Sequence, residues 1–344
     1  METMRADIEA LNSIISRIKI MANMDISEKR LPQDGRTSYD VDGRSIDLRV
    51  STLPTIYGEK VVMRILDRTN FVLSKEKLGL TKYDEELFEK MICNPYGIIL
   101  ATGPTGSGKT STLYAMMSQL NDARKNIITL EDPVEYNLEG INQVQLNTKA
   151  GLTFASGLRS ILRQDPDIIM VGEIRDAETA AIAARAALTG HLVLSTLHTN
   201  DAPGAVARLI DMGIEPFLIS SSLIGVIAQR LVRKVCTFCC VSYEPDERER
   251  RILGIKNENM QKIYKGAGCP MCNGTGYQGR TAIFEIMEVG KEIREMIDRR
   301  ASTDELRNAA ISNGMRTLLE SSINLFLEGV TTVEELARVT FGYY

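Results

Sequence analysis

The octapeptide Gly103-Pro-Thr-Gly-Ser-Gly-Lys-Thr110 has the residue types and spacing that bind a nucleoside triphosphate such as ATP or GTP. Its glycines let a turn close around phosphate, and backbone N–H groups and a helix N-terminus supply hydrogen-bond donors. We expect Lys109 to reach the β- and γ-phosphates and the Thr110 hydroxyl to ligate Mg²⁺. The alternative is a glycine-rich turn without chemistry. The predicted nucleotide-binding residues are Gly103, Pro104, Thr105, Gly106, Ser107, Gly108, Lys109, Thr110 and Ser111.

Two acidic residues follow apolar runs that we predict to be strands. Glu131 follows residues 126–130 and precedes Pro133, which turns the chain out of a sheet, and Glu173 follows residues 168–171. Ligands of open α/β sheets bind at the carboxyl ends of the strands, so both acids are catalytic candidates. Glu131 is suited to orienting or deprotonating an attacking water, and Glu173 to holding the Mg²⁺ shell through water. The alternative for each is a solvated surface carboxylate.

The two histidines of the chain, His191 and His198, flank the apolar run at residues 192–196. We expect His198 at the carboxyl edge of this predicted strand. An imidazole beside the γ-phosphate can sense that group and hydrogen-bond to a catalytic carboxylate. A structural histidine remains the alternative at both positions.

The pairs Cys236-x-x-Cys239 and Cys269-x-x-Cys272 have the spacing of two zinc knuckles. Four thiolates can surround Zn²⁺ tetrahedrally, and the alternatives are free thiols or a redox pair. The 29 residues between the pairs exceed common ribbon spacing, so we expect a charged helical insert over residues 246–265. Cys93 and Cys240 have no evident partner in the pattern.

Length and composition limit the class of protein. A chain of 344 residues exceeds one ordinary core, so two or three domains are expected. Hydrophobic and charged fractions of 44% and 25% are ordinary for a globular protein. The net charge of −4 argues against a dedicated polyanion binder, and no apolar run is long enough to predict a membrane span.

Strand and helix patterns place these residues on separate elements. A helix at residues 5–23 and strands near 37–41, 45–50 and 60–66 predict a small α+β unit. Farther along, apolar strands at 98–101, 126–130, 168–171 and 192–196 alternate with helices, which predicts an α/β domain with a mostly parallel sheet. The predicted domains are 1–70 (α+β), 71–80 (linker and hinge), 81–235 (α/β), 236–281 (zinc-binding) and 282–344 (amphipathic helices).

Four segments in this order, GPTGSGKT, ITLEDPVEY, DIIMVGEIRD and TGHLVLSTLHTND, resemble the Walker A, aspartate-box, atypical Walker B and histidine-box motifs of bacterial secretion ATPases. The chain is most similar to the GspE/PilB type, the type II secretion and type IV pilus assembly ATPases, from about residue 17 to 340. The resemblance implies a RecA-like P-loop ATPase domain, preceded by a small PAS-like α+β domain and followed by a tetracysteine zinc-binding insert and C-terminal helices.

For individual residues, the resemblance implies that Glu131 is the catalytic acid, Glu173 the Mg²⁺-shell residue, and His191 and His198 a nucleotide-responsive pair. Lys109 would join them as the catalytic lysine. The resemblance further implies arginines from the PAS-like domain at the nucleotide site. The candidates are Arg36, Arg49 and Arg64, each of which otherwise forms an ordinary surface ion pair.

The implied cofactors are ATP, Mg²⁺ and Zn²⁺. The implied partners are a homo-hexameric ring, an inner-membrane platform protein and other assembly-apparatus components, with no nucleic acid, at the cytoplasmic face of the inner membrane. The tetracysteine favours extension or secretion over retraction. Members usually carry a further N-terminal domain, so we expect a short member or a truncated chain. A RecA-like nucleic-acid motor with a zinc ribbon and a non-hydrolysing nucleotide-binding scaffold remain the alternatives.

Overall fold

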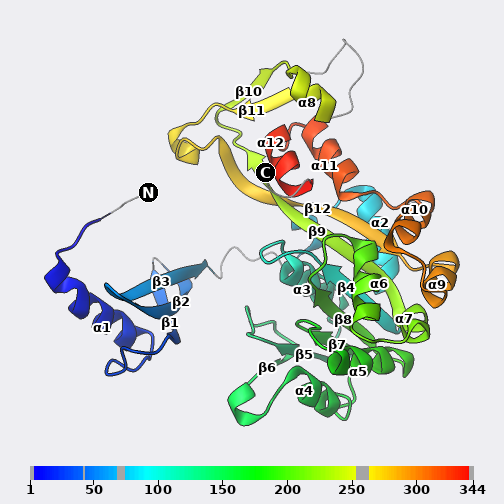
Figure 1. Cartoon of the computed structure of the whole chain (residues 1–344), viewed down its shortest axis with the longest axis horizontal. Helices are drawn as coiled ribbons and strands as arrows, with labels where there is room; N and C mark the ends of the chain where they lie inside the picture. The colour runs from blue at the N-terminus through cyan, green and yellow to red at the C-terminus, as the bar shows by residue number, and fades with distance from the viewer. Residues whose placement is uncertain (1–3, 42, 68–73, 253–262, 341–344) are drawn as a thin grey trace. The chain divides into compact units, whose positions relative to one another are not determined.

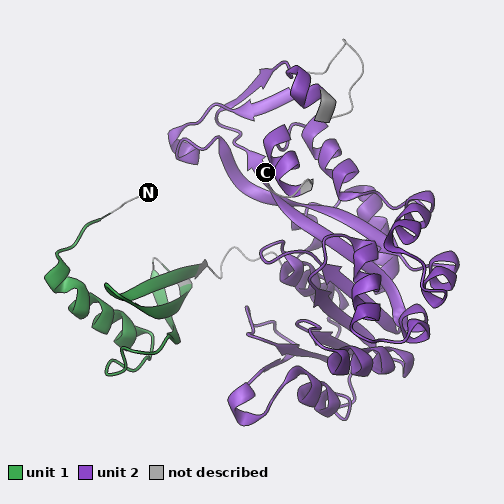
Figure 2. Ribbon diagram, in the orientation of Figure 1, with its two compact units in different colours: residues 1–71 green, residues 72–344 purple. Residues whose placement is uncertain are grey.

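A computed structural model describes residues 4–41, 43–67, 74–252 and 263–340, and the chain divides into two compact units, residues 1–71 and 72–344 (Figure 2). Residues 68–73, which include the start of the predicted linker, and 253–262 of the predicted insert lie outside the described residues. The predicted domain limits at residues 70, 80 and 235 stay predictions. None of the described helices has the length and apolar character needed to span a bilayer.

The first unit consists of one helix on a three-stranded antiparallel sheet. Ile15 of the helix is buried, and the buried Lys19 ammonium lies 2.6 Å from Glu59 and donates to the Glu28 carbonyl at 2.7 Å. A Cβ at Gly35 would meet the Ala22 carbonyl at 2.2 Å, so glycine permits this close approach of helix end and sheet. These elements make an α+β unit, while the PAS-like assignment stays a prediction. They are α1 (Leu11–Met21), β1 (Gln33–Val41), β2 (Arg44–Thr55) and β3 (Gly58–Asp67).

The second unit is built on a seven-stranded mixed sheet in the order β12-β9-β4-β8-β7-β5-β6 (Figure 1). The strands from β9 to β6 are parallel, and β12 pairs antiparallel with β9. All residues of β4, β5, β7 and β8 are buried, as expected when helices cover both faces. The α/β prediction is therefore confirmed. The strands are β4 (Gly97–Thr102), β5 (Ile127–Glu131), β6 (Asn142–Gln145), β7 (Ile168–Val171), β8 (Leu192–Leu197), β9 (Leu223–Val235) and β12 (Tyr277–Glu288).

Successive side chains of a strand point to opposite faces of the sheet, and helices pack against both faces. Leu100, Ile169 and Val193 join one buried cluster with side chains of four helices, α4 to α7. Ile99 and Met170 point to the opposite face, where α3 contacts β4 and β8. The helices are α2 (Lys82–Ile92), α3 (Lys109–Leu120), α4 (Phe154–Ile161), α5 (Ala177–Leu188), α6 (Ala202–Asp211) and α7 (Pro216–Ser222).

The predicted helical segment 282–344 is wrong at its start, because β12 continues to Glu288 and the first helix begins at Lys291. The run Ala282–Met287 is buried throughout, and periodicity alone does not distinguish such a run from a buried helix. The predicted helical insert 246–265 is also partly wrong, because its end is a strand, β11, paired with β10. The elements are β10 (Cys240–Tyr243), α8 (Glu247–Ile252), β11 (Ile263–Gly266), α9 (Lys291–Asp298), α10 (Thr303–Ser312), α11 (Leu318–Leu327) and α12 (Val333–Thr340).

A buried ion cluster fastens α12 to β9. The Glu335 carboxylate, with 1% of its side chain exposed, accepts from the Arg233 N–H and guanidinium, each at 2.9 Å, and from Arg338 at 2.8 Å. Burial alone would raise the pKa of Glu335, but the two guanidinium groups and the N–H lower it to about 2. Glu335 is therefore ionised in the folded chain at neutral pH.

We predict that Glu335→Gln lowers the free energy of unfolding at pH 7 by about 1–3 kcal/mol, since hydrogen bonds to a charged group are lost. The folded pKa lies below the ordinary value of 4.5. The stabilisation is therefore complete above the unfolded pKa and declines as pH falls from about 4.5 towards 2. Urea unfolding at pH 7 and pH 4 should show a smaller difference between wild type and variant at pH 4. Glu334→Gln, on the same helix but exposed, is the control. A pH-independent difference would contradict this assignment.

Candidate functional site

Residues 103–108 form a compact loop between the carboxyl end of β4 and the first residue of α3 (Figure 1). Gly103, Gly106 and Gly108 have φ values of 149°, 79° and 91°, which favour glycine. A Cβ at Gly103 would meet the Gln229 carbonyl and the Ser107 hydroxyl at 2.6 Å. The loop therefore folds against β9, with the N-terminus of α3 opening into it.

Lys109 bends back over this loop. Its ammonium donates to the carbonyls of Gly103 at 2.8 Å and Pro104 at 3.1 Å, and the residue is buried. Burial lowers the pKa of Lys109 to about 8, although nearby Glu173 acts in the opposite direction. Among the described residues, the buried Ser107 hydroxyl has no hydrogen-bond partner. The poorly solvated Lys109 ammonium and the Ser107 hydroxyl, which has no partner among the described residues, lie at the N-terminus of α3 and are suited to binding an anionic phosphate.

Gln229 of β9 holds the loop in shape. Its amide donates to the Ser107 carbonyl at 2.8 Å and accepts from the Thr112 hydroxyl at 2.7 Å, and only 1% of the residue is exposed. Gln229 is not among the predicted site residues. The available signal is a polar pair, Gln229-Arg230, within an otherwise apolar stretch from Val226 to Val232.

Glu173 and His198 meet beside the loop, at the carboxyl ends of β7 and β8. The His198 Nε2 lies 3.5 Å from a Glu173 carboxylate oxygen, and Arg175 forms an ion pair with the same carboxylate. The contact of His198 with Glu173 brings two of the candidate site residues together. Arg175 was not among the predicted site residues, although it lies in the same motif.

Glu131 ends β5 and is 3% exposed. Its carboxylate accepts from the Thr129 hydroxyl at 2.6 Å, from the Gln143 amide at 3.1 Å, and from the Tyr114 hydroxyl. The predicted acid thus lies at the expected sheet edge, but inside a buried polar network. Neither Gln143 nor Tyr114 was identified from the sequence, because their relation to Glu131 depends on tertiary contacts.

His191 lies at the opposite edge of the sheet from the loop. It precedes β8, whereas His198 follows it, and a six-residue strand separates them. At about 3.3 Å per residue this is roughly 20 Å. The His191 Nδ1 lies 2.9 Å from the Ala186 carbonyl, close to the end of α5. Within this chain, the predicted pair of nucleotide-responsive histidines is not brought together.

The three candidate arginines form a row across the sheet of the first unit. Arg36 of β1 is paired in register with Arg49 of β2, which is paired with Arg64 of β3. Residues opposite each other in antiparallel strands project from the same face. Arg36 and Arg64 are exposed, and Arg49 is half-buried.

A cavity of about 680 Å³ opens beside residues 104–107. Its wall includes the charged residues Arg230, Arg307, Asp201 and Glu285. Its volume falls in the range of small-molecule sites. The cavity therefore extends the loop's potential ligand-binding region towards β9 and β12.

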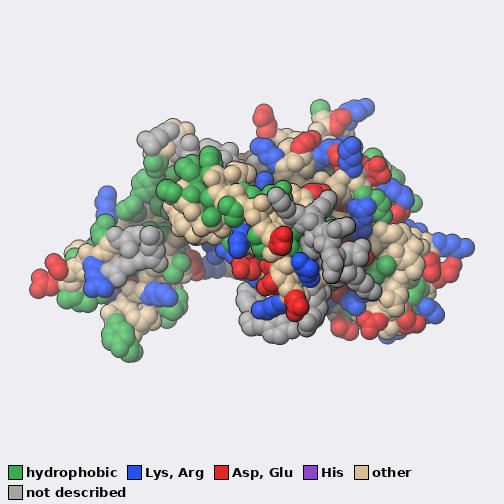
Figure 3. Space-filling model, turned by 90° about the horizontal axis from the view of Figure 1, so that it is seen from above, with side chains coloured by type: hydrophobic (Ala, Val, Ile, Leu, Met, Phe, Trp, Pro, Cys, Tyr) green, Lys and Arg blue, Asp and Glu red, His purple; other side chains and the backbone are tan. Residues whose placement is uncertain are grey.

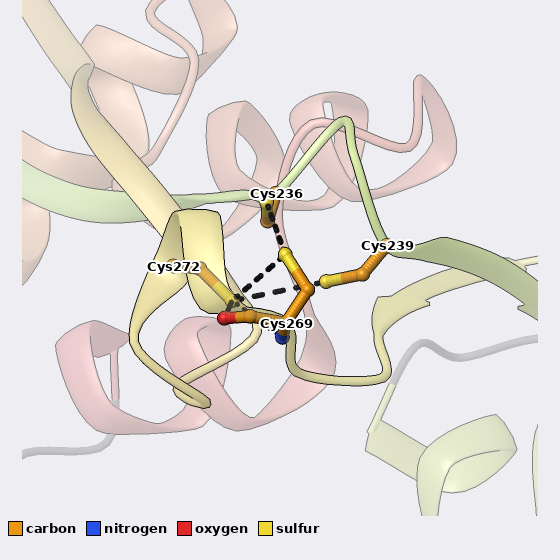
Figure 4. A group of neighbouring side chains, drawn as sticks. All are labelled: Cys236, Cys239, Cys269 and Cys272. Atoms are coloured by element: carbon orange, nitrogen blue, oxygen red, sulfur yellow. Dashed lines mark hydrogen bonds between the residues drawn. The ribbon is translucent and has the colours of Figure 1, made fainter.

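The four cysteines lie at the far end of the β9–β12 pair and converge on one point (Figure 4). Their Sγ atoms all lie within 4.8 Å of one another, with three separations of 3.7–3.9 Å. A tetrahedral tetrathiolate with metal–sulfur bonds near 2.3 Å needs separations of about 3.8 Å. The described residues therefore present one group that could hold a metal ion, formed by Cys236, Cys239, Cys269 and Cys272.

Backbone N–H groups favour the thiolate form of Cys272 in this cluster. The Cys272 sulfur accepts from the N–H groups of Cys269 at 3.1 Å and Gly276 at 3.2 Å. Burial raises the pKa of Cys272, but these N–H groups lower it to about 6. A Cβ at Gly266 would lie 2.0 Å from the Gly276 carbonyl, so glycine permits the close approach of the two chain segments that flank the second cysteine pair. Cys240 is exposed and outside the cluster.

Comparison with known proteins gives consistent matches over nearly the whole chain. The family model described as type II/IV secretion system protein matches residues 1–338. Type II secretion system protein E of Pseudomonas aeruginosa is 53% identical over 327 residues, covering 95% of this chain and 65% of that protein. Type IV pilus assembly ATPase PilB of Thermus thermophilus is 54% identical over 332 residues, covering 96% and 37%. The chain thus spans about two thirds of the first relative and just over a third of the second.

Solved structures agree on the fold. The pilus retraction motor PilT with bound ADP has a TM-score of 0.66 and 28% identity, covering 90% of this chain and 78% of that one. The Legionella pneumophila ATPase DotB has a TM-score of 0.72 over 100% of this chain and 86% of that one, and at 20% identity it indicates a common fold alone.

We predict that Gln229→Leu weakens the binding of a nucleoside triphosphate about tenfold, which corresponds to about 1.4 kcal/mol. The substitution leaves the Ser107 carbonyl and the Thr112 hydroxyl without the bonds that shape the loop. Binding of a fluorescent ATP analogue, followed by titration, would measure the effect. Gln119→Leu, at the distant exposed end of α3, is the control and should bind normally. An unchanged Kd in Gln229→Leu would show that the loop does not depend on Gln229.

Proposed function

Because the chain belongs to the type II/IV secretion system protein family, we propose that it is a Mg²⁺-dependent ATPase that powers type IV pilus assembly or type II protein secretion. The supporting observation is that the P-loop, the Glu173–His198 pair and Glu131 lie at the carboxyl ends of parallel strands in one mixed sheet. The names of the relatives, type II secretion system protein E and pilus assembly ATPase PilB, support the two candidate machineries.

Each candidate residue has a separate role in phosphoryl transfer. The α3 N-terminus and Lys109 hold the phosphates. Thr110 and Glu173 would hold Mg²⁺, which would supply positive charge to stabilise the phosphate oxygens. Water attacks the γ-phosphorus, the bond to the β–γ bridging oxygen breaks to leave ADP, and the proton of the water passes to Glu131. His198 responds to the γ-phosphate through its contact with Glu173.

The arginine row has side chains suited to binding phosphate. Three guanidinium groups in register match the multiple negative charges of a triphosphate, and guanidinium binds phosphate oxygens in bidentate fashion. We assign Arg36, Arg49 and Arg64 to charge neutralisation, either in their own chain or across a contact between copies. Completion between copies fits a homo-hexameric ring that works with a platform protein at the cytoplasmic face of the inner membrane.

We assign the tetracysteine cluster to structural Zn²⁺. The sulfur separations and the N–H donors fit a closed tetrathiolate, which is the usual form of a structural zinc site. No nucleic acid is assigned as a partner. Lysine and arginine side chains are interspersed with acidic ones on the face shown in Figure 3, which fits the net charge of −4.

We expect the chain to hydrolyse ATP in the presence of Mg²⁺, with turnover per chain that rises with protein concentration as copies complete each other's sites. Lys109→Ala should reduce turnover by about two orders of magnitude or more, since a charge aimed at the phosphates is lost. Lys125→Ala, an exposed lysine beyond α3, is the control. Phosphate release measured over a concentration series provides the test.

Turnover that persists in Lys109→Ala would contradict ATP hydrolysis at this loop. Turnover that is flat with concentration, in a chain shown by mass measurement to be monomeric, would contradict completion between copies. Stimulation by DNA that falls steeply with salt would favour the nucleic-acid motor instead.

Protein purified without chelator is expected to contain about one zinc ion per chain. Cys239→Ser and Cys272→Ser should lose it, because each removes one of the four converging sulfurs. Cys240→Ser should keep it, since that cysteine neighbours the cluster without joining it. Elemental analysis gives the metal content, and a wild-type value far below one per chain would refute the assignment.

A further inference from the structure

Tyr114 joins the P-loop helix to the candidate catalytic acid. It lies on α3, five residues after Lys109, and is fully buried. Its hydroxyl donates to Oε2 of Glu131 and accepts from the Glu135 N–H at 3.3 Å. The Tyr114 side chain therefore links α3, which carries it, to the end of β5 and to the loop that follows β5.

The hydrogen bonds of Glu131 leave one direction open on its carboxylate. A carboxylate offers about four lone-pair positions. Within the described residues, Oε1 accepts from Thr129 and Gln143, and Oε2 accepts from Tyr114. The remaining lone pair is on Oε2, the oxygen that Tyr114 orients, and an attacking water would have to bind at this position.

Of these three donors, Tyr114 is the one carried by α3. Thr129 belongs to β5 itself, and Gln143 belongs to β6, which is paired with β5, so both follow the strand that carries Glu131. Tyr114 instead follows Lys109 along a continuous helix, at a rise of about 7.5 Å. The Tyr114 hydroxyl therefore links the helix that begins at Lys109 directly to the Glu131 carboxylate.

The phenol remains a donor under ordinary conditions. Burial, and then the hydrogen bond and negative charge of Glu131, raise the pKa of Tyr114 well above its usual value. The O–H group is therefore retained, and it directs its hydrogen towards the carboxylate, which can only accept.

We propose that Tyr114 is a positioning residue, whose hydroxyl aligns the Glu131 carboxylate with the phosphates held by the P-loop. This inference rests on the proposed function, because it requires Glu131 to receive the proton of the attacking water. Tyr114 itself contacts neither substrate nor metal. Its effect is exerted entirely through the orientation of Glu131.

Tyr114→Phe tests this role, because it removes the hydroxyl and keeps the buried ring. The kcat for ATP hydrolysis should fall about ten- to a hundredfold, as expected when proton transfer loses its alignment. The KM for ATP should stay within about twofold, because the phosphate-binding groups are retained. Tyr83→Phe, which removes a hydroxyl bound to the Gly314 carbonyl at 2.7 Å, is the matched control and should retain wild-type kcat and KM.

A double-mutant cycle separates positioning from general destabilisation. If Tyr114 acts through Glu131, then adding Tyr114→Phe to Glu131→Gln should cause no further loss of the residual turnover. The inference would be overturned if Tyr114→Phe lowered turnover by the same factor in the wild type and in Glu131→Gln. An unchanged kcat in Tyr114→Phe would overturn it as well. A wild-type chain without turnover at any concentration would overturn the proposed function as well, so the two failures are distinguishable.

Discussion

The parallel pairing of β4, β8, β7 and β5 is the constraint on which the candidate site depends. Parallel strands end at the same edge of a sheet, so the P-loop, His198, Glu173 and Glu131 become neighbours although nearly a hundred residues separate the first from the last in the chain. The strands are buried on both faces, and this burial fixes their register. Packing at the centre of the sheet therefore determines which site residues are neighbours at its carboxyl edge.

Buried polar side chains then set the finer geometry. Gln229 holds the loop, and Glu285 of β12 accepts from the N–H groups of Ala202 at 2.8 Å and Leu318 at 3.2 Å, at the beginnings of α6 and α11. Burial raises the pKa of Glu285, and the two N–H groups oppose this effect. Each such group requires its partners in place, since an unpaired buried polar atom is costly. These contacts tie the elements around the cavity to a single arrangement.

The parts of this site that depend on local pattern were predictable, and those that depend on tertiary contacts were not. The P-loop, Glu173 and the cysteine pairs are recognisable because strand, turn and ligand lie within a short segment. His191 and His198 lie at opposite ends of β8, as the sequence pattern predicts, and their role as a nucleotide-responsive pair stays a prediction. The strand at residues 277–288 was missed because burial on both faces removes alternation. The roles of Gln229 and Tyr114 depend on hydrogen bonds to residues on other elements, which the sequence pattern does not show.

The long strand β9 has a mechanical consequence. It touches the P-loop at Gln229 and ends at Val235, directly before Cys236 of the tetracysteine cluster, while β12 is hydrogen-bonded alongside it. If the paired strands tilted as one body about Gln229, a tilt of about five degrees would move the cysteine end, roughly 23 Å away at about 3.3 Å per residue, by about 2 Å. The pairing of β9 with β12 therefore couples the geometry of the P-loop to the position of the tetracysteine cluster.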